Sequence, residues 1–226
     1  MHPYHRRRHS DARLAAITEY LGDPAGLKIL DLGALDGWFS HQLANRGALC
    51  TAADDHPTLT EAPGVTVINE RLTPTKIRAL GEFDAAICLS ALHHMPSWRA
   101  TLNALLAVAP LVFVETAHPD ETLPKASHHK DSGRITNAIE KAGGVAITTT
   151  PGYDAKYQRP LWVIDNRPPD GNTYPQAPTS VVDIFGTGNS EWCINHDSQN
   201  TLGVFLRASL RGRRPANLRL DLHNDI

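Results

Sequence analysis

The chain has 226 residues, a formal net charge of −2 and 41% hydrophobic residues, with 16 glycines and 16 prolines. This length allows one domain with an appendage, and the hydrophobic content is that of a folded protein rather than a disordered one. No apolar run approaches the roughly 20 residues that span a bilayer, and residues 1–8 lack the apolar segment of a secretion signal. We therefore expect a soluble, cytoplasmic protein with no membrane contact.

The three cysteines, Cys50, Cys88 and Cys193, are far apart in the sequence. Their spacing matches neither a disulfide framework nor a C-x-x-C metal site, so we expect reduced thiols. Adjacent histidine pairs rarely direct both rings at one ion. We accordingly predict no bound metal.

Apolar periodicity predicts an alternation of helices and strands after a first helix over 10–21, for which Ser10 is a candidate cap. Strands are expected at 27–32, 48–53, 64–68, 83–89, 111–115, 145–149 and 161–165, and further helices at 37–46, 74–80, 98–108 and 132–142. This order is typical of an α/β, doubly wound (Rossmann-like) sheet of seven strands.

A glycine-bearing turn follows the first strand, in the sequence Asp31-Leu32-Gly33-Ala34-Leu35-Asp36-Gly37. Glycine permits positive φ and close approach of a ligand to the main chain. We expect Asp36 to cap the next helix, whose Phe39, Leu43 and Arg46 stem would face the sheet. A dinucleotide fingerprint has three glycines, and here Leu35 stands where the middle one belongs.

The second strand runs into Asp54-Asp55, roughly twenty residues beyond the turn. An acid in this place can accept hydrogen bonds from both hydroxyls of a ribose. Asp54 is the first choice for that contact. The turn and the acid together predict a bound nucleotide-like cofactor.

These motifs make residues 27–165 resemble the class I S-adenosylmethionine-dependent methyltransferases. The resemblance implies a mostly parallel sheet with antiparallel pairing at one edge, and S-adenosylmethionine as cofactor. It places Asp31 near the methionine part, the Gly33–Gly37 turn beneath the cofactor and Asp54 at the ribose. The stretch Asp36-Gly37-Trp38-Phe39-Ser40 is similar to a subset with a D-G-x-F-S turn, which includes some tRNA wobble-uridine modifying enzymes.

Ligands of open α/β sheets bind at the carboxyl ends of the strands, and these ends supply the remaining candidates. The resemblance assigns the end of the third strand to the adenine and the end of the fourth to cofactor and substrate. The full set of expected cofactor contacts is Asp31, Gly33, Ala34, Leu35, Gly37, Trp38, Phe39, Asp54, Asp55, Glu70, Arg71, Leu72, Leu89 and Ser90.

Histidines and one acid near the ends of the fourth and fifth strands are candidates for chemistry on the acceptor. His93, His94 and His118 are candidate general bases, because imidazole titrates near neutral pH. His93 and His94 are alternatively residues that fix a loop. Glu115, His128 and His129 are candidate substrate contacts, and Glu115 is equally interpreted as a polar strand end.

The composition changes beyond Asp165, which divides the chain into a methyltransferase-like domain over 1–165, a proline-rich linker over 166–180 and a β-rich extension over 181–226. Strand-like runs in the extension lie at 181–185, 191–194, 203–206 and 218–222. The extension is short for an independent domain, so we expect it to pack on the first domain or to join two copies of the chain.

Arginines gather near both ends of the chain, at Arg6, Arg7, Arg8, Arg13, Arg207, Arg211, Arg213, Arg214 and Arg219. If the ends meet, they form a basic surface that suits RNA phosphates. The alternative is a solvated tail with scattered arginines, which the net charge of −2 favours.

Three functions are therefore open. The first is a methyltransferase acting on an unidentified small molecule or RNA nucleotide. The second is a nicotinamide-dependent oxidoreductase, for which Gly33 and Gly37 are an incomplete fingerprint. The third is a non-catalytic binding or assembly module built on the same fold.

Overall fold

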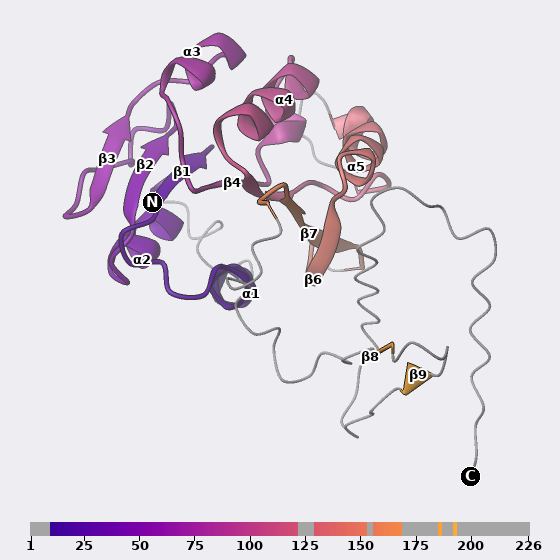
Figure 1. Ribbon diagram of the computed structural model, residues 1–226. Helices are drawn as coiled ribbons and strands as arrows, with labels where there is room; N and C mark the ends of the chain where they lie inside the picture. Colours follow the sequence, from indigo (N-terminus) through magenta and orange to yellow (C-terminus); the bar gives the residue numbers. More distant parts are fainter. Residues whose placement is uncertain (1–9, 122–128, 153–155, 169–184, 187–191, 194–226) are drawn as a thin grey trace. The chain divides into compact units, whose positions relative to one another are not determined.

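The computed structural model describes residues 10–121, 129–152, 156–168, 185–186 and 192–193 (Figure 1). The chain divides into two compact units, Met1–Pro175 and Gln176–Ile226. In the second unit, β8 (Phe185–Gly186) and β9 (Trp192–Cys193) pair as a two-stranded antiparallel sheet. The other strands expected beyond residue 180, and every arginine of the two terminal clusters except Arg13, lie outside the described residues.

The first unit is built on a seven-stranded sheet with the order β3-β2-β1-β4-β5-β7-β6. The strands are β1 (Lys28–Leu32), β2 (Leu49–Ala53), β3 (Val65–Ile68), β4 (Ala85–Leu89), β5 (Leu111–Glu115), β6 (Val145–Pro151) and β7 (Gln158–Asp165). Strands β1 to β5 are parallel, and β7 is antiparallel to both β5 and β6. The predicted sheet is thus confirmed, and its reversed strand lies one place in from the edge.

Helices cover both faces of this sheet, as a mostly parallel sheet requires. They are α1 (Ser10–Leu21), α2 (Trp38–Ala44), α3 (Pro74–Ala79), α4 (Trp98–Val108) and α5 (Ser132–Lys141), with short 3₁₀ turns η1 (Leu92–His94) and η2 (His129–Asp131). One face packs against α3, α4 and α5, through residues such as Ile77, Leu105 and Ile139. The other face packs against α1 and α2, and Figure 1 shows the two helix layers on opposite sides of the strands.

The order of the strands creates a switch point between β1 and β4. β1 pairs with β2 on one side and with β4 on the other, so the connections after β1 and β4 leave in opposite directions. The carboxyl ends of two neighbouring strands are open to a ligand at such a point. The turn after β1 and the segment after β4 therefore face each other across this edge.

Two details of α2 differ from the sequence prediction. Its N-cap is Gly37, in left-handed conformation with φ 76°, while the Asp36 carboxylate accepts a hydrogen bond from the Trp38 N–H at 3.3 Å. Leu43 and Phe39 pack against the core as expected, Leu43 fully buried and Phe39 half-buried, and Ser40 is buried beside them. Arg46 lies beyond the end of α2, is exposed and donates to the Gln42 carbonyl. The helix begins one residue later than expected, and Ser40 is one of its buried residues.

We expect Phe113→Ala to lower the free energy of unfolding by about 3–5 kcal/mol, because it leaves a cavity in a close-packed core. Phe113 is fully buried on β5, and Tyr20 of α1 packs edge-on against its ring at 5.8 Å. Urea denaturation measures the loss. Leu49→Ala is the control, since Leu49 is 54% exposed and its truncation should cost about 0.5 kcal/mol or less.

Candidate functional site

The turn after β1 is fastened to the end of β2. The N–H groups of Gly33 and Ala34 both donate to the carbonyl of Ala53, at 2.9 and 3.2 Å. Gly33 has φ 80°, and a Cβ added there would come within 2.5 Å of the Ala91 Cβ. Glycine is therefore required at Gly33 because the segment after β4 packs directly on the turn.

Leu35 takes the left-handed conformation that a middle glycine would take, with φ 56°. This conformation is uncommon for a residue that has a Cβ. The Leu35 N–H donates to Asp54 Oδ2 at 2.9 Å, and Asp54 Oδ1 accepts from the His56 N–H at 3.0 Å. The Asp54 carboxylate thus holds the turn in shape, a role that the sequence did not reveal. Its contact with a ribose stays a prediction.

Asp31 is an almost fully buried acid at the end of β1, with 3% of its surface exposed. Its Oδ2 accepts a hydrogen bond from the Ser40 hydroxyl at 2.7 Å. Burial raises the pKa of the Asp31 carboxyl to about 7, and the negative charges of Asp54 and Asp36 add to this, while the bond from Ser40 opposes it. The pKa of Asp31 therefore depends on the charges of two other acids at the same turn.

The residues expected on the adenine side divide between surface and core. Asp55 and Arg71 form an ion pair of 3.2 Å at the surface, with more than half of each side chain exposed. Glu70 pairs with Lys76. Leu72 is buried in the hydrophobic core.

Two aromatic residues expected to contact the cofactor lie at the start of α2. The Trp38 and Phe39 rings meet edge to face at 5.0 Å, and the Arg13 guanidinium of α1 lies 5.2 Å from the centre of the Phe39 ring. Such a cation–π contact fastens α1 to α2. Arg13 is only 4% exposed, so it does not belong to an exposed basic surface, as its inclusion in the N-terminal arginine cluster had implied.

Glu115, at the end of β5, is fully buried and accepts hydrogen bonds from three separate segments. Arg13 Nη1 of α1 and the Ser90 hydroxyl donate to Oε2 at 2.7 and 2.6 Å, and the Thr150 hydroxyl of β6 donates to Oε1 at 3.2 Å. A buried carboxylate needs such partners to remain charged. Both oxygens of the Glu115 carboxylate thus accept hydrogen bonds from within the protein.

A second buried ion pair lies beside the first. Arg159 Nε of β7 donates to Glu121 Oε2 at 2.6 Å, and Arg159 Nη1 donates to the Ser90 hydroxyl oxygen at 3.3 Å. A Cβ on Gly152, the residue after β6, would come within 2.7 Å of Glu121 Oε1, so glycine leaves room for this ion pair. Ser90 consequently joins the two ion pairs into one network.

The candidate histidines differ in burial and in hydrogen bonding. His93 is 1% exposed, and its Nδ1 accepts a hydrogen bond from the Ala117 N–H at 3.3 Å. His118 is half-buried, and its Nδ1 accepts a hydrogen bond from the Asp120 N–H at 3.2 Å. The His118 ring stacks on Tyr157. In a neutral ring with Nδ1 as acceptor, Nε2 carries the proton. His93 thus fixes the loop after β5, and His94 is the exposed member of its pair. His129 lies in η2, and His128 lies outside the described residues.

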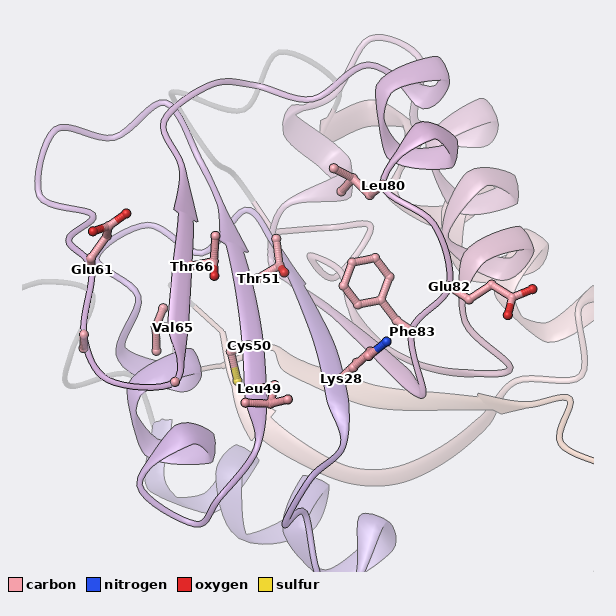
Figure 2. A pocket seen from close by; sticks show the side chains of 12 residues that line it. Lys28, Leu49, Cys50, Thr51, Glu61, Val65, Thr66, Leu80, Glu82 and Phe83 are labelled. Carbon is pink, nitrogen blue, oxygen red and sulfur yellow. The ribbon is translucent and has the colours of Figure 1, made fainter.

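A hollow of about 710 Å³ lies at the other end of the sheet, and Figure 2 shows the side chains around it. Lys28, Leu49 and Val65, the first residues of β1, β2 and β3, line it together with Phe83. It is therefore at the amino ends of the strands. Because open α/β sheets bind ligands at the carboxyl ends, we do not place the cofactor there.

The structure brings most of the predicted cofactor residues to one edge, and it adds residues that the sequence analysis did not single out. Ser40 was hidden because the apolar pattern of α2 pointed to Phe39, and Arg159 lay outside the expected limits of its strand. Within the described ranges, no group of three or more His, Cys, Asp or Glu side chains is placed to hold a metal ion. In the same part of the chain, no helix combines the length and apolar character needed to cross a membrane.

Comparison with known proteins is consistent with this geometry. Residues 30–109 match the family described as a methyltransferase domain. A ubiquinone biosynthesis O-methyltransferase of Xanthomonas axonopodis pv. citri (strain 306) is 29% identical, with 47% of this chain and 56% of that protein covered. The equivalent protein of Xanthomonas oryzae pv. oryzae (strain PXO99A) is 27% identical over the same shares. The chain thus spans about half the length of these relatives.

Solved structures show the same fold. The bifunctional kinase-methyltransferase WbdD superposes with a TM-score of 0.59 at 28% identity, over 71% of this chain and 40% of that chain. The magnesium protoporphyrin IX methyltransferase of Synechocystis PCC 6803 with bound SAM gives a TM-score of 0.51 at 21% identity, over 69% of this chain and 77% of that chain. The latter similarity concerns the fold alone.

We expect Asp31→Asn to alter how stability depends on pH. Because the pKa of Asp31 is raised from 3.8 to about 7, the folded state retains a proton between these values that the unfolded chain has lost. The contribution of Asp31 to wild-type stability should therefore fall as pH rises from about 4 to about 7, by at most about 1.4 kcal/mol per pH unit. Well above pH 7, this group should cause no further change.

Asparagine does not ionise, so the stability of Asp31→Asn relative to wild type should increase over that pH range. Urea unfolding of both proteins at pH 5, 6, 7 and 8 measures this difference. Asp120→Asn is the control, because the Asp120 side chain is 77% exposed. A difference between Asp31→Asn and wild type that is independent of pH would contradict the assignment.

Proposed function

We propose that this chain, whose first unit belongs to the class I S-adenosylmethionine-dependent methyltransferase superfamily, transfers a methyl group from S-adenosylmethionine to a hydroxyl acceptor. The match to the methyltransferase domain over residues 30–109 covers the turn after β1, the end of β2 and the segment after β4. These are the segments that meet at the switch point of the sheet.

The observation that carries this proposal is the acidic character of the turn after β1. Asp31, Asp36 and Asp54 lie close enough for the last two to raise the pKa of the first. S-adenosylmethionine carries positive charge on its sulfonium and its ammonium group, and acids attract both. The residues present therefore fit this cofactor.

The same charges disfavour a nicotinamide dinucleotide. Its pyrophosphate would lie on the glycine turn at the start of α2, where the Asp36 carboxylate would repel it. Leu35, which has a side chain, stands where the dinucleotide fingerprint has its middle glycine. Electrostatics and backbone thus both favour the sulfonium cofactor over the dinucleotide.

When bound, S-adenosylmethionine supplies a methyl group that is already activated. The chain has to hold it, orient it and exclude water. We assign the ribose hydroxyls to Asp54 and the methionine end to the turn that starts at Asp31, which leaves the reacting end toward Ser90. The rim beyond Ser90 carries His94 and His118, and we assign this rim to the acceptor.

A hydroxyl acceptor is supported by the two Xanthomonas relatives, whose names describe O-methyl transfer. Glu115 and Glu121 are each bonded to a buried arginine, so neither is expected to take the acceptor proton. His94 is the exposed imidazole at this rim and is the candidate base.

Binding of S-adenosylhomocysteine to the full chain tests the cofactor assignment. A ligand that binds only the folded state raises its melting temperature, by an amount equivalent to about 2.7 kcal/mol at a hundredfold excess over Kd. We expect such a shift with S-adenosylhomocysteine and none with NAD in a thermal-shift titration. A shift with NAD alone would overturn the proposal, and no shift with either ligand would favour a non-catalytic module.

Asp54→Ala should weaken S-adenosylhomocysteine binding at least tenfold, because it removes both the ribose acceptor and the anchor of Leu35. Isothermal titration calorimetry measures the affinity. Asp55→Ala is the matched control: Asp55 is the next residue, is exposed and pairs with Arg71 at the surface, so we expect a change below about threefold. Equal losses in the two variants would show that the ribose assignment is wrong.

A further inference from the structure

Among the residues that the structure describes, two that are not glycine have positive φ, Leu35 at 56° and Ser90 at 57°. They follow β1 and β4, the two neighbouring strands of the switch point. The left-handed conformation is unfavourable for a residue with a Cβ and persists only where the surroundings impose it. Each of the two is bonded to a carboxylate, Leu35 through its N–H to Asp54 and Ser90 through its hydroxyl to Glu115.

Ser90 is held on both sides. Its hydroxyl donates to Glu115 Oε2 at 2.6 Å and accepts from Arg159 Nη1 at 3.3 Å, and its N–H donates to the Glu115 carbonyl at 2.9 Å. Glu115 is itself fixed by Arg13 of α1 and Thr150 of β6. The conformation of Ser90 therefore depends on segments from both ends of the domain sequence.

The shape of the Ser90 segment reaches the cofactor turn through its neighbour. A Cβ on Gly33 would lie only 2.5 Å from the Ala91 Cβ, which is too close for two carbon atoms. The two segments are therefore in direct contact. A change of φ at Ser90 redirects the chain at Ala91. The turn after β1 would then lose the surface on which it packs.

Stability alone does not account for the buried pair of Arg13 and Glu115. Their side chains are 5% and 0% exposed, and the loss of hydration largely offsets the attraction between such charges. A well-packed apolar pair of similar size is often as stable. What an apolar pair lacks is an acceptor for the Ser90 hydroxyl.

We propose that Glu115 is a positioning residue of the cofactor edge, which holds Ser90 in its left-handed conformation and is in turn held by Arg13 of α1. The inference rests on the proposed function, because it requires that S-adenosylhomocysteine binds at this edge. Glu115 acts through Ser90 and does not touch the cofactor.

Two substitutions of Ser90 separate conformation from hydrogen bonding. Ser90→Ala and Ser90→Gly both remove the hydroxyl, but glycine adopts positive φ without steric cost. We expect Ser90→Ala to weaken S-adenosylhomocysteine binding about tenfold, equivalent to about 1.4 kcal/mol. We expect Ser90→Gly to bind at least about threefold more tightly than Ser90→Ala, because glycine adopts positive φ without the hydroxyl; calorimetry measures both affinities at a temperature where circular dichroism shows each variant folded.

The double variant Arg13→Met/Glu115→Leu removes both charges of the buried pair and should lose affinity to the same extent as Ser90→Ala. Adding Ser90→Gly to it should raise the affinity to that of the Ser90→Gly single variant, because glycine adopts positive φ without the carboxylate. The control Asp165→Leu/Arg167→Met removes a partly buried ion pair at the opposite end of the sheet, where Asp165 pairs with Leu111, and should leave affinity unchanged.

The proposal is overturned if wild type binds S-adenosylhomocysteine and Ser90→Ala binds equally well, or if alanine and glycine lose affinity equally. It is also overturned if the triple variant binds as weakly as the double variant. If the double variant does not fold, the comparison of alanine with glycine at Ser90 decides alone. Absence of binding by wild type would instead overturn the proposed function.

Discussion

The buried carboxylate of Glu115 is the interaction on which the carboxyl edge of the sheet depends. It joins α1, the segment after β4 and β6, and its partner Arg13 lies 102 positions away in the sequence. An unpaired charge in this interior would be very costly, so all these segments must arrive together. The edge of the sheet is therefore held by residues that are distant in the sequence.

The carboxyl edge of the sheet has two halves, which differ in whether arginines compensate the charges of their acidic side chains. Beside β1 and β2, Asp31, Asp36 and Asp54 act on one another, and burial raises the pKa of Asp31 to about 7. Beside β4 and β5, buried arginines pair with Glu115 and Glu121. The first half is suited to a cationic ligand, whereas in the second half an arginine balances each of these buried carboxylates.

The strained backbone positions lie after β1 and β4, the neighbouring strands at which these two halves meet. Leu35 and Ser90 both have positive φ, and each is held by a carboxylate from another segment. Strained residues of this kind persist where the surrounding structure determines them, and they tend to gather at functional sites. The large hollow at the amino ends of β1, β2 and β3 has no such feature, in agreement with its distance from the switch point.

The amino-acid sequence by itself determined the order of helices and strands, the glycine turn and the position of Asp54, because periodicity and turn chemistry are local properties. It also indicated the superfamily and its cofactor. It missed Ser40 because a polar residue does not contribute to an apolar pattern, and it assigned Arg13 to an exposed cluster although the structure buries it.

Only the tertiary structure revealed the hydrogen-bond partners of Glu115, Ser90 and Arg159. Glu115 could be a substrate contact or a polar strand end from its position alone, and nothing near it in sequence names Arg13 or Thr150 as partners. Hydrogen bonds between distant segments have no periodic signature, and left-handed φ at a serine or leucine contradicts local propensity. These features arise from packing, which the sequence expresses only through the complete fold.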